Sequence, residues 1–206
     1  MEQSKRVYIL ESNNSGELSV ETLRSAAVID NLYYADLLDF YMEYIYNIPQ
    51  GMDVYIISSQ NIILQKIKKY QGVKENLYLI KKENRGRDIS ALLIAAKPIV
   101  RKYGYICFIH DKKEKAEYSK EDAIDWNVNL WDNSVGSEAY VRNLLLKFEQ
   151  NTNLGMLVPP NPNGKYLGLY GELLWARDYD NTVELAKRMG LACIIEKDIP
   201  PMTIGT

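Results

Sequence analysis

The sequence has little of several residue types that mark particular classes of protein. Its 206 residues include one histidine and two cysteines, and Cys107 and Cys193 match no metal-binding or redox spacing. Cys107 lies within an apolar run, which indicates a small buried thiol and a reducing compartment. No stretch approaches the roughly 18 apolar residues of a membrane span, and the apolar part of the N-terminus is too short for a secretory signal. We therefore expect a soluble, cytoplasmic protein.

The sequence also lacks an excess of charge of either sign. Lys and Arg together number 25 and Asp and Glu 27, which gives a net charge of -2. This balance excludes a general polyanion binder, so nucleic acid is not an expected partner and any basic site must be local. The 47% hydrophobic content fills a sizeable core. Because no repeat or linker divides the chain, we expect a single domain over residues 1–206.

Strand-like segments alternate with helix-like segments along most of the chain. The strand-like segments are residues 26–32, 52–58, 76–82, 103–113 and 154–160. Strands that are followed this regularly by helices favour a mainly parallel sheet whose ligands bind at the carboxyl ends of the strands. The pattern predicts an α/β fold, a Rossmann-like three-layer sandwich with a mainly parallel central sheet.

The helix that follows the third strand has two marked positions. Ile89, Leu92, Leu93 and Ala96 recur at helical spacing, which puts Asp88 at the N-cap position. Pro98 interrupts this pattern and predicts a kink, or a second short helix that begins near Lys97.

Two polar loops follow the third and fourth strands and should lie side by side. The first loop contains Asn84, Arg85, Gly86, Arg87 and Asp88, and the second contains His110, Asp111, Lys112 and Lys113. Arginine makes forked contacts to phosphate oxygens and lysine supplies a compact charge, so the pattern indicates a diphosphate site. Read singly, Asp88 is an ordinary N-cap, the arginines are solvated, His110 is structural and residues 111–115 form a solvated charge run.

The two motifs resemble those of a known family. "ENRGRDISALL", "YGYICFIHDKK", a tryptophan-containing helical region and "LGMLVPP" together resemble the rhamnan synthesis protein F family over roughly residues 26–206. The resemblance implies a bacterial glycosyltransferase of cell-wall or lipopolysaccharide polysaccharides. An aromatic pair that usually follows the segment matching residues 200–206 is absent here, and we therefore expect a chain truncated at its C-terminus.

A looser resemblance to GT-A glycosyltransferases bears on mechanism. In that type a D-x-D motif holds a divalent metal on the nucleotide diphosphate, whereas this chain has "HDK" at residues 110–112. The resemblance therefore implies no expected cofactor, and a divalent metal is kept as an alternative that no D-x-D motif supports. Lys112 with Arg85 or Arg87 is expected to neutralise the diphosphate instead. Asp111 is favoured as the catalytic base by its location, although Lys112 and Lys113 should depress its pKa. The other carboxylates considered for this role are Asp125, Asp132 and Glu172.

The predicted function is transfer of a sugar from a nucleotide-sugar, dTDP-L-rhamnose by resemblance, to a polysaccharide or lipid-linked glycan at the inner face of the membrane. In this hypothesis Asn84, Gly86 and Lys113 complete the donor site and His110 orients phosphate or sugar. Core burial is expected for at least one of Trp126 and Trp131, and Tyr166 and Tyr170 are acceptor-side candidates. The main alternative is a non-catalytic sugar-binding or assembly domain of the same fold. A flavodoxin-like regulator ranks last because no glycine-rich loop follows the first strand.

Overall fold

The chain is organised as two compact units. The computed structural model describes residues 8–70, 74–113, 120–160, 175 and 178–198, and of residues 120–125 it describes only the backbone. The units are Met1–Leu157 and Val158–Thr206, and each is considered by itself. In the smaller unit, helix α9 (Tyr179–Arg188) begins at Tyr179, whose hydroxyl donates a 3.1 Å hydrogen bond to the carbonyl of Ile195. A single domain over residues 1–206 stays a prediction.

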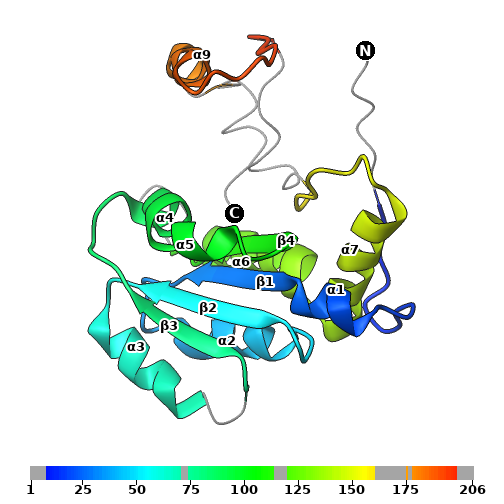
Figure 1. Ribbon diagram of the computed structural model, residues 1–206. Coiled ribbons are helices and arrows are strands. Elements are labelled where there is room, and N and C mark those ends of the chain that lie inside the picture. Colours follow the sequence, from blue (N-terminus) through cyan, green and yellow to red (C-terminus); the bar gives the residue numbers. More distant parts are fainter. Residues whose placement is uncertain (1–7, 71–73, 114–119, 161–174, 176–177, 199–206) are drawn as a thin grey trace. The chain divides into compact units, whose positions relative to one another are not determined.

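A four-stranded, fully parallel sheet forms the centre of the larger unit (Figure 1). Its order is β3-β2-β1-β4, and its strands are β1 (Ala26–Asn31), β2 (Asp53–Ser58), β3 (Leu77–Lys81) and β4 (Tyr105–His110). Every residue of β1 is buried because this strand lies between two neighbours and two helical layers. The Rossmann-like α/β fold predicted from the sequence is confirmed.

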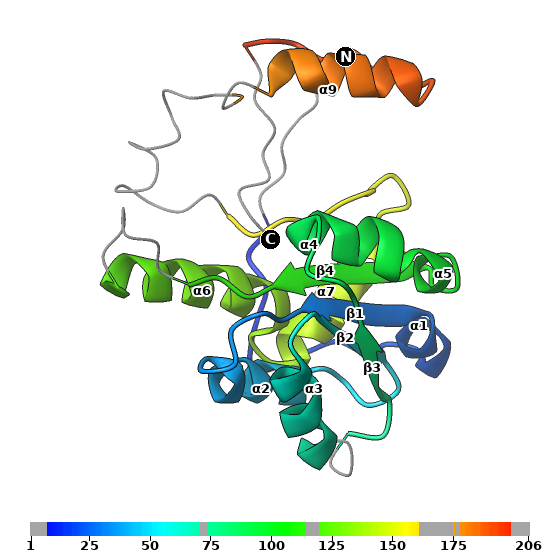
Figure 2. The same ribbon diagram turned by 90° about the vertical axis from the view of Figure 1, so that its left-hand side faces the viewer.

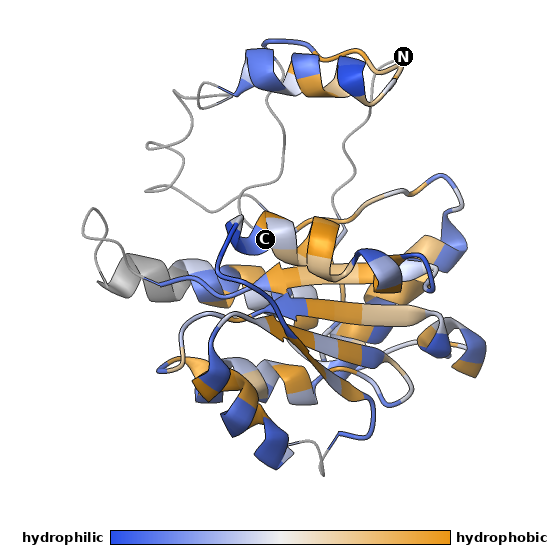
Figure 3. Ribbon diagram, turned by 60° about the vertical axis from the view of Figure 1, so that its left-hand side comes forward, coloured by the Kyte–Doolittle hydropathy of each residue, from blue (hydrophilic) through white to orange (hydrophobic). Residues whose placement is uncertain are grey.

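One face of the sheet carries the larger hydrophobic core. The helices that contribute to this core are α2 (Leu38–Tyr46), α3 (Asn61–Ile67), α6 (Lys120–Val135) and α7 (Glu138–Gln150). The larger unit also has two shorter helical segments, α1 (Val20–Arg24) and η1 (Lys68–Tyr70). Tyr41, Ile63 and Trp131 are fully buried there beside strand residues such as Val28 and Ile56. Figure 3 shows the hydrophobic stretches concentrated in the sheet and on helix faces. The burial of Trp131 confirms the expectation for at least one tryptophan.

The opposite face carries a broken helix. It consists of α4 (Arg87–Ser90), the π-helix η2 (Ala91–Ala95) and α5 (Lys97–Val100), and Figure 2 shows α4 and α5 across the sheet from α2 and α3. The Ala96 N–H donates to the Ala91 carbonyl at 2.8 Å, which is a π-type bond, and Pro98 lies in the first turn of α5. The second helix predicted near Lys97 is therefore confirmed. The wider turn leaves Ile89 and Leu93 exposed.

The described segment after α7 forms no strand, contrary to the prediction. The predicted fifth strand at residues 154–160 is wrong, because this segment pairs with no strand in the part of the chain that is described. Pro159 and Pro160 lack the N–H groups that a sheet ladder uses, which weakens such pairing. No helix within the described ranges is long and apolar enough to span a bilayer.

An unpaired acid lies in the central strand. Asp30 is fully buried, and neither of its carboxylate oxygens has a hydrogen-bond partner among the described residues. Burial raises the pKa of Asp30 well above its usual range, and the negative charge of Asp111 adds to the shift. Burial therefore favours the neutral acid form of Asp30, which lies on the same face as Val28 and Tyr41.

Replacing Asp30 by asparagine should stabilise the protein at neutral pH. The raised pKa means that the folded state holds a proton that the unfolded state has lost, so stability falls as pH rises from the ordinary aspartate value towards the folded one. Asp30→Asn should raise the free energy of unfolding at pH 7.5 by on the order of 2 kcal/mol and flatten this pH dependence. Urea unfolding between pH 5 and 8 measures both effects.

Glu43→Gln is the matched control, because it also removes one negative charge, at an exposed position of α2. It should change stability by less than about 0.5 kcal/mol and keep the slope with pH. A destabilised Asp30→Asn variant with an unchanged slope would contradict a protonated Asp30.

Candidate functional site

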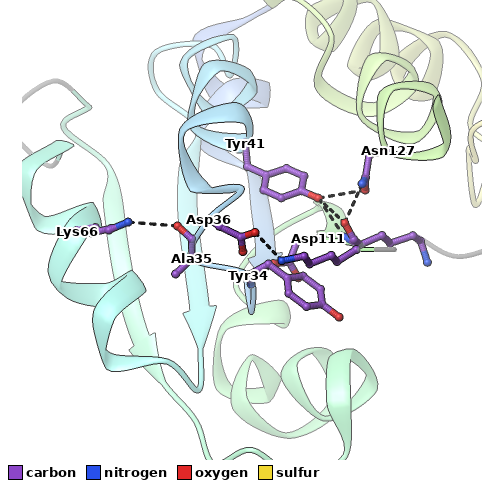
Figure 4. Close-up of polar contacts among 9 residues, drawn as sticks. Tyr34, Ala35, Asp36, Tyr41, Lys66, Asp111 and Asn127 are labelled. Carbon is purple, nitrogen blue, oxygen red and sulfur yellow. Dashed lines mark hydrogen bonds and ion pairs between the residues drawn. The ribbon is translucent and has the colours of Figure 1, made fainter. Parts of the chain in front are cut away.

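The carboxylate of Asp111 joins the loop after β1 to the end of β4. Asp111 directly follows β4 and is 6% exposed. Its Oδ2 accepts hydrogen bonds from the backbone N–H groups of Tyr33 and Tyr34, each at 2.6 Å. Figure 4 shows Asp111 beside Tyr34. The Asp111 N–H in turn donates to the Asn31 carbonyl at 3.3 Å. These bonds fix the β1–α2 loop at the carboxyl edge of the sheet, where ligands of such folds bind.

The electrostatics of Asp111 differ from the expectation. Burial raises its pKa to about 6, the amide donors partly offset the shift, and the charge of Asp36 adds to it. The predicted depression of this pKa by Lys112 and Lys113 is wrong because both ammonium groups are directed elsewhere. Lys112 Nζ lies 5.4 Å from the ring centroid of Trp126, and Lys113 Nζ is bonded to Asp36.

The backbone of Lys112 is held from two helices. The Tyr41 hydroxyl of α2 lies 3.1 Å from both the Lys112 carbonyl and the Lys112 N–H, so it can donate to the first and accept from the second. Asn127 of α6 donates to the same carbonyl at 2.8 Å and lies 3.1 Å from the Tyr41 hydroxyl. Tyr41 and Asn127 are buried, so this small network holds the β4 loop in one conformation.

Three loops meet around the side chain of Tyr34. Lys113 Nζ is 2.5 Å from Asp36 Oδ2 and 5.8 Å from the centroid of the Tyr34 ring. The positive charges of Lys113 and Arg87 both lower the pKa of Tyr34, although burial and Asp111 raise it overall. Arg87 begins α4, so cations from the loops after β3 and β4 act on one residue of the loop after β1. The ammonium group of Lys113 thus lies near the Tyr34 ring, and a shared role of the two motifs in one binding site stays a prediction.

His110 lies on the other face of the sheet from Asp111. Its Nε2 is 3.6 Å from Asp88 Oδ2, and its Nδ1 is 3.1 Å from the Asp111 carbonyl oxygen. Burial lowers the pKa of His110, and the charge of Lys112 lowers it further, against the opposing influence of Asp88. His110 is therefore neutral at pH 7, and its contact with Asp88 links the two loops directly.

The turn before α4 is built differently from the expectation. The prediction of Asp88 as N-cap is wrong, since α4 begins at Arg87 with Gly86 at the N-cap position and no side-chain cap bond. Gly86 and Arg87 have φ values of 71° and 49°, in the left-handed region. Ser90 Oγ donates to the Arg85 and Arg87 carbonyls at 2.5 and 2.9 Å. Asp88 is thereby free of a capping role and faces His110.

The remaining residues that were predicted to belong to the site lie in different parts of the chain. Asn84 and Arg85 are exposed beside Gly86, and the Arg85 carbonyl also accepts from Lys82 Nζ at 3.3 Å. Asp132 accepts a hydrogen bond from Tyr44 in the last turn of α2, away from the strand carboxyl ends. Glu172, Tyr166 and Tyr170 lie outside the described residues, as does the side chain of Asp125. No group of three or more metal-ligating side chains occurs within the described part of the chain.

Sequence reasoning missed Tyr34, Asp36, Tyr41 and Asn127. The available signal was the "YYAD" segment, which follows the first strand at the same sheet edge as the two motifs. The edge as assembled offers guanidinium and ammonium groups with a neutral phenol and a neutral imidazole. That combination suits an anion with several oxygen acceptors.

Comparison with known proteins gives one match. A family model described as rhamnan synthesis protein F matches residues 1–206, the whole chain. The chain belongs to this family. Membership indicates a role in the synthesis of rhamnan or a related polysaccharide. No curated protein and no solved structure matches the chain at a significant level.

Replacing Gly86 by alanine should destabilise the turn that presents Arg87. A Cβ at this position would lie 2.7 Å from Ser90 Cβ, and the φ of 71° already disfavours an L-residue. We expect Gly86→Ala to lower the free energy of unfolding by about 1–2 kcal/mol, as measured by urea unfolding.

Gly155→Ala serves as the control, since a Cβ there meets nothing within 4 Å and φ is not positive. Equal stabilities of the two variants would show that the Gly86 turn relaxes without cost.

Proposed function

We propose that this protein binds a nucleotide-sugar, dTDP-L-rhamnose, and transfers the sugar to a growing polysaccharide or lipid-linked glycan. The observation that carries the proposal is that the loops after β1, β3 and β4 meet at the carboxyl edge of a parallel sheet, with His110 3.6 Å from Asp88 and Lys113 5.8 Å from the Tyr34 ring centroid. Family membership supports the sugar chemistry. The proposal locates the protein in the cytoplasm, at the inner face of the membrane where the glycan is assembled.

Side-chain cations are proposed to neutralise the leaving diphosphate. "HDK" at residues 110–112 stands at the strand end where the GT-A resemblance would place a metal-binding D-x-D motif. Arg87 and Lys113 supply the charge near Tyr34, and Lys112, Arg85 and the Asn84–Gly86 backbone extend the same edge. One preorganised donor aimed at developing charge is worth about 3 kcal/mol, so several cations are sufficient in magnitude.

Asp111 and His110 differ in what their contacts support. Asp111 has a pKa of about 6, which suits a general base, but its Oδ2 is already occupied by two amide N–H groups. Its contacts support an anchoring role. Neutral His110, in contact with Asp88, is placed to orient a phosphate or the sugar through hydrogen bonding.

A non-catalytic binding domain is the second candidate. The observation that favours it is the occupation of Asp111, the carboxylate preferred as base, by backbone donors. Incubation with dTDP-L-rhamnose and a rhamnan acceptor separates the two functions. Release of dTDP with elongation of the acceptor supports the transferase, whereas binding without release supports the alternative.

Removing the guanidinium of Arg87 should weaken donor binding. A charge-assisted hydrogen bond contributes about 1.5–3 kcal/mol, so Arg87→Ala should raise the Kd for dTDP-L-rhamnose by roughly tenfold or more in isothermal titration calorimetry.

Arg101→Ala is the control, because Arg101 is an exposed arginine at the end of α5, before the amino end of β4. Its Kd should equal that of the wild type. Unchanged affinity in Arg87→Ala would exclude the proposed diphosphate clamp.

A further inference from the structure

Tyr34 is held in place more firmly than its position in a loop suggests. Its backbone N–H is bonded to Asp111, and its ring packs edge-on against Tyr33 with centroids 5.3 Å apart. Lys113 Nζ lies over the ring face at 5.8 Å. The backbone and the ring are therefore both constrained, while the residue stays partly exposed at the sheet edge.

The hydroxyl of Tyr34 is available for a ligand. Other phenols of the larger unit are used within the fold, since Tyr41 bonds Lys112, Tyr44 bonds Asp132 and Tyr70 bonds Asp39. Within the described residues Tyr34 makes no such hydroxyl bond, although it lies within the electrostatic influence of Arg87 and Lys113. The raised pKa keeps the phenol protonated at neutral pH, so it can donate a hydrogen bond.

The neighbouring ion pair can open to admit an anion. The side chains of Lys113 and Asp36 are 44% and 59% exposed, and an ion pair this exposed to solvent contributes little to stability. A phosphoryl group gives Lys113 a partner of higher charge than the carboxylate. Tyr34 would then face an oxygen that is already neutralised from two sides.

We propose that Tyr34 binds the diphosphate of the donor, with its hydroxyl donating to a phosphoryl oxygen that Arg87 and Lys113 neutralise and with Asp111 acting as the positioning residue for the loop. This inference rests on the proposed function and adds a third segment, the β1–α2 loop, to the donor site. It assigns Asp111 a role through Tyr34 rather than in proton transfer.

The test compares Tyr34→Phe with Tyr46→Phe by isothermal titration calorimetry. Tyr46 is an exposed tyrosine at the end of α2, away from the candidate site, and its ring contacts Tyr70. The two probes are inorganic pyrophosphate and dTDP-L-rhamnose, and thermal unfolding checks that each variant folds. Tyr34→Phe should bind both probes about tenfold more weakly, while Tyr46→Phe should match the wild type.

A double-mutant cycle tests the positioning role of Asp111. Asp111→Ala should weaken pyrophosphate binding, and adding Tyr34→Phe should then cost clearly less than in the wild type, because the released loop no longer aims the phenol. A purely structural contribution of Asp111 would lower stability yet leave the effect of Tyr34→Phe on affinity unchanged. That additive result would overturn the positioning role.

The outcomes separate this inference from the proposed function. Wild-type affinity of Tyr34→Phe for both probes overturns the role of Tyr34 and leaves the donor site intact if Arg87→Ala weakens binding. Binding of pyrophosphate but not of dTDP-L-rhamnose by the wild type overturns the proposed donor, and the pyrophosphate data still decide the role of Tyr34. Absence of binding to either probe overturns both.

Discussion

The geometry of the candidate site depends on one buried carboxylate that accepts two backbone N–H groups. Asp111 accepts hydrogen bonds from the amides of Tyr33 and Tyr34. These bonds join parts of the chain that are separated by 78 and 77 positions in the sequence. Parallel pairing of β1 and β4 brings the two strand ends together, but it does not by itself order the loops beyond them. The carboxylate does so, because it satisfies two donors that a turn at a sheet edge would otherwise leave to solvent.

The site is assembled at an electrostatic cost to the fold. Burial raises the pKa of Asp111 and, more strongly, that of Asp30. The charge of Asp111 further opposes the ionisation of Asp30, and the charge of Asp36 opposes that of Asp111. Burial also raises the pKa of Cys107 to about 12, with Asp30 adding to the effect. Two acids in one apolar layer are destabilising at neutral pH. Such arrangements concentrate at functional sites, where stability is given up for the positioning of particular groups.

The sequence was sufficient for the features that depend on local pattern. The strands at residues 26–32 and 52–58, the helix break at Pro98 and the adjacency of the two motif loops follow from apolar runs, proline chemistry and parallel topology. The pKa of Asp111 was not predictable, because neighbours in sequence say nothing of where Lys112 and Lys113 direct their charges. The prediction of a fifth strand at residues 154–160 was wrong for a related reason. An apolar run indicates that a segment can form a strand, but it does not show whether a neighbouring strand is available for pairing.

Tyr34 and Gly86 show the same limit at the scale of single residues. Asp88 fitted the N-cap preference, yet the left-handed backbone at Gly86 and Arg87 starts the helix two residues earlier, and sequence spacing does not encode this conformation. Tyr34 looked like one of 16 tyrosines. Its significance arises from contacts with Asp111 and Lys113, and such long-range contacts produce no periodic pattern in the sequence.

The contacts that the cations make within the protein bear on how selective the proposed site would be. Lys113 forms an ion pair with Asp36, and Lys112 lies over the Trp126 ring. An anion that binds these lysines must therefore compete with contacts that the protein already makes. A single carboxylate or monoanion gains little from that exchange, because it replaces one equivalent charge by another. A diphosphate carries more charge and more acceptor oxygens, and it can engage Arg87, Lys113 and a neutral phenol together. In the proposed function, prior pairing of the cations would lower the affinity for all anions but would lower it least for the most highly charged one, and so would favour a diphosphate over smaller anions.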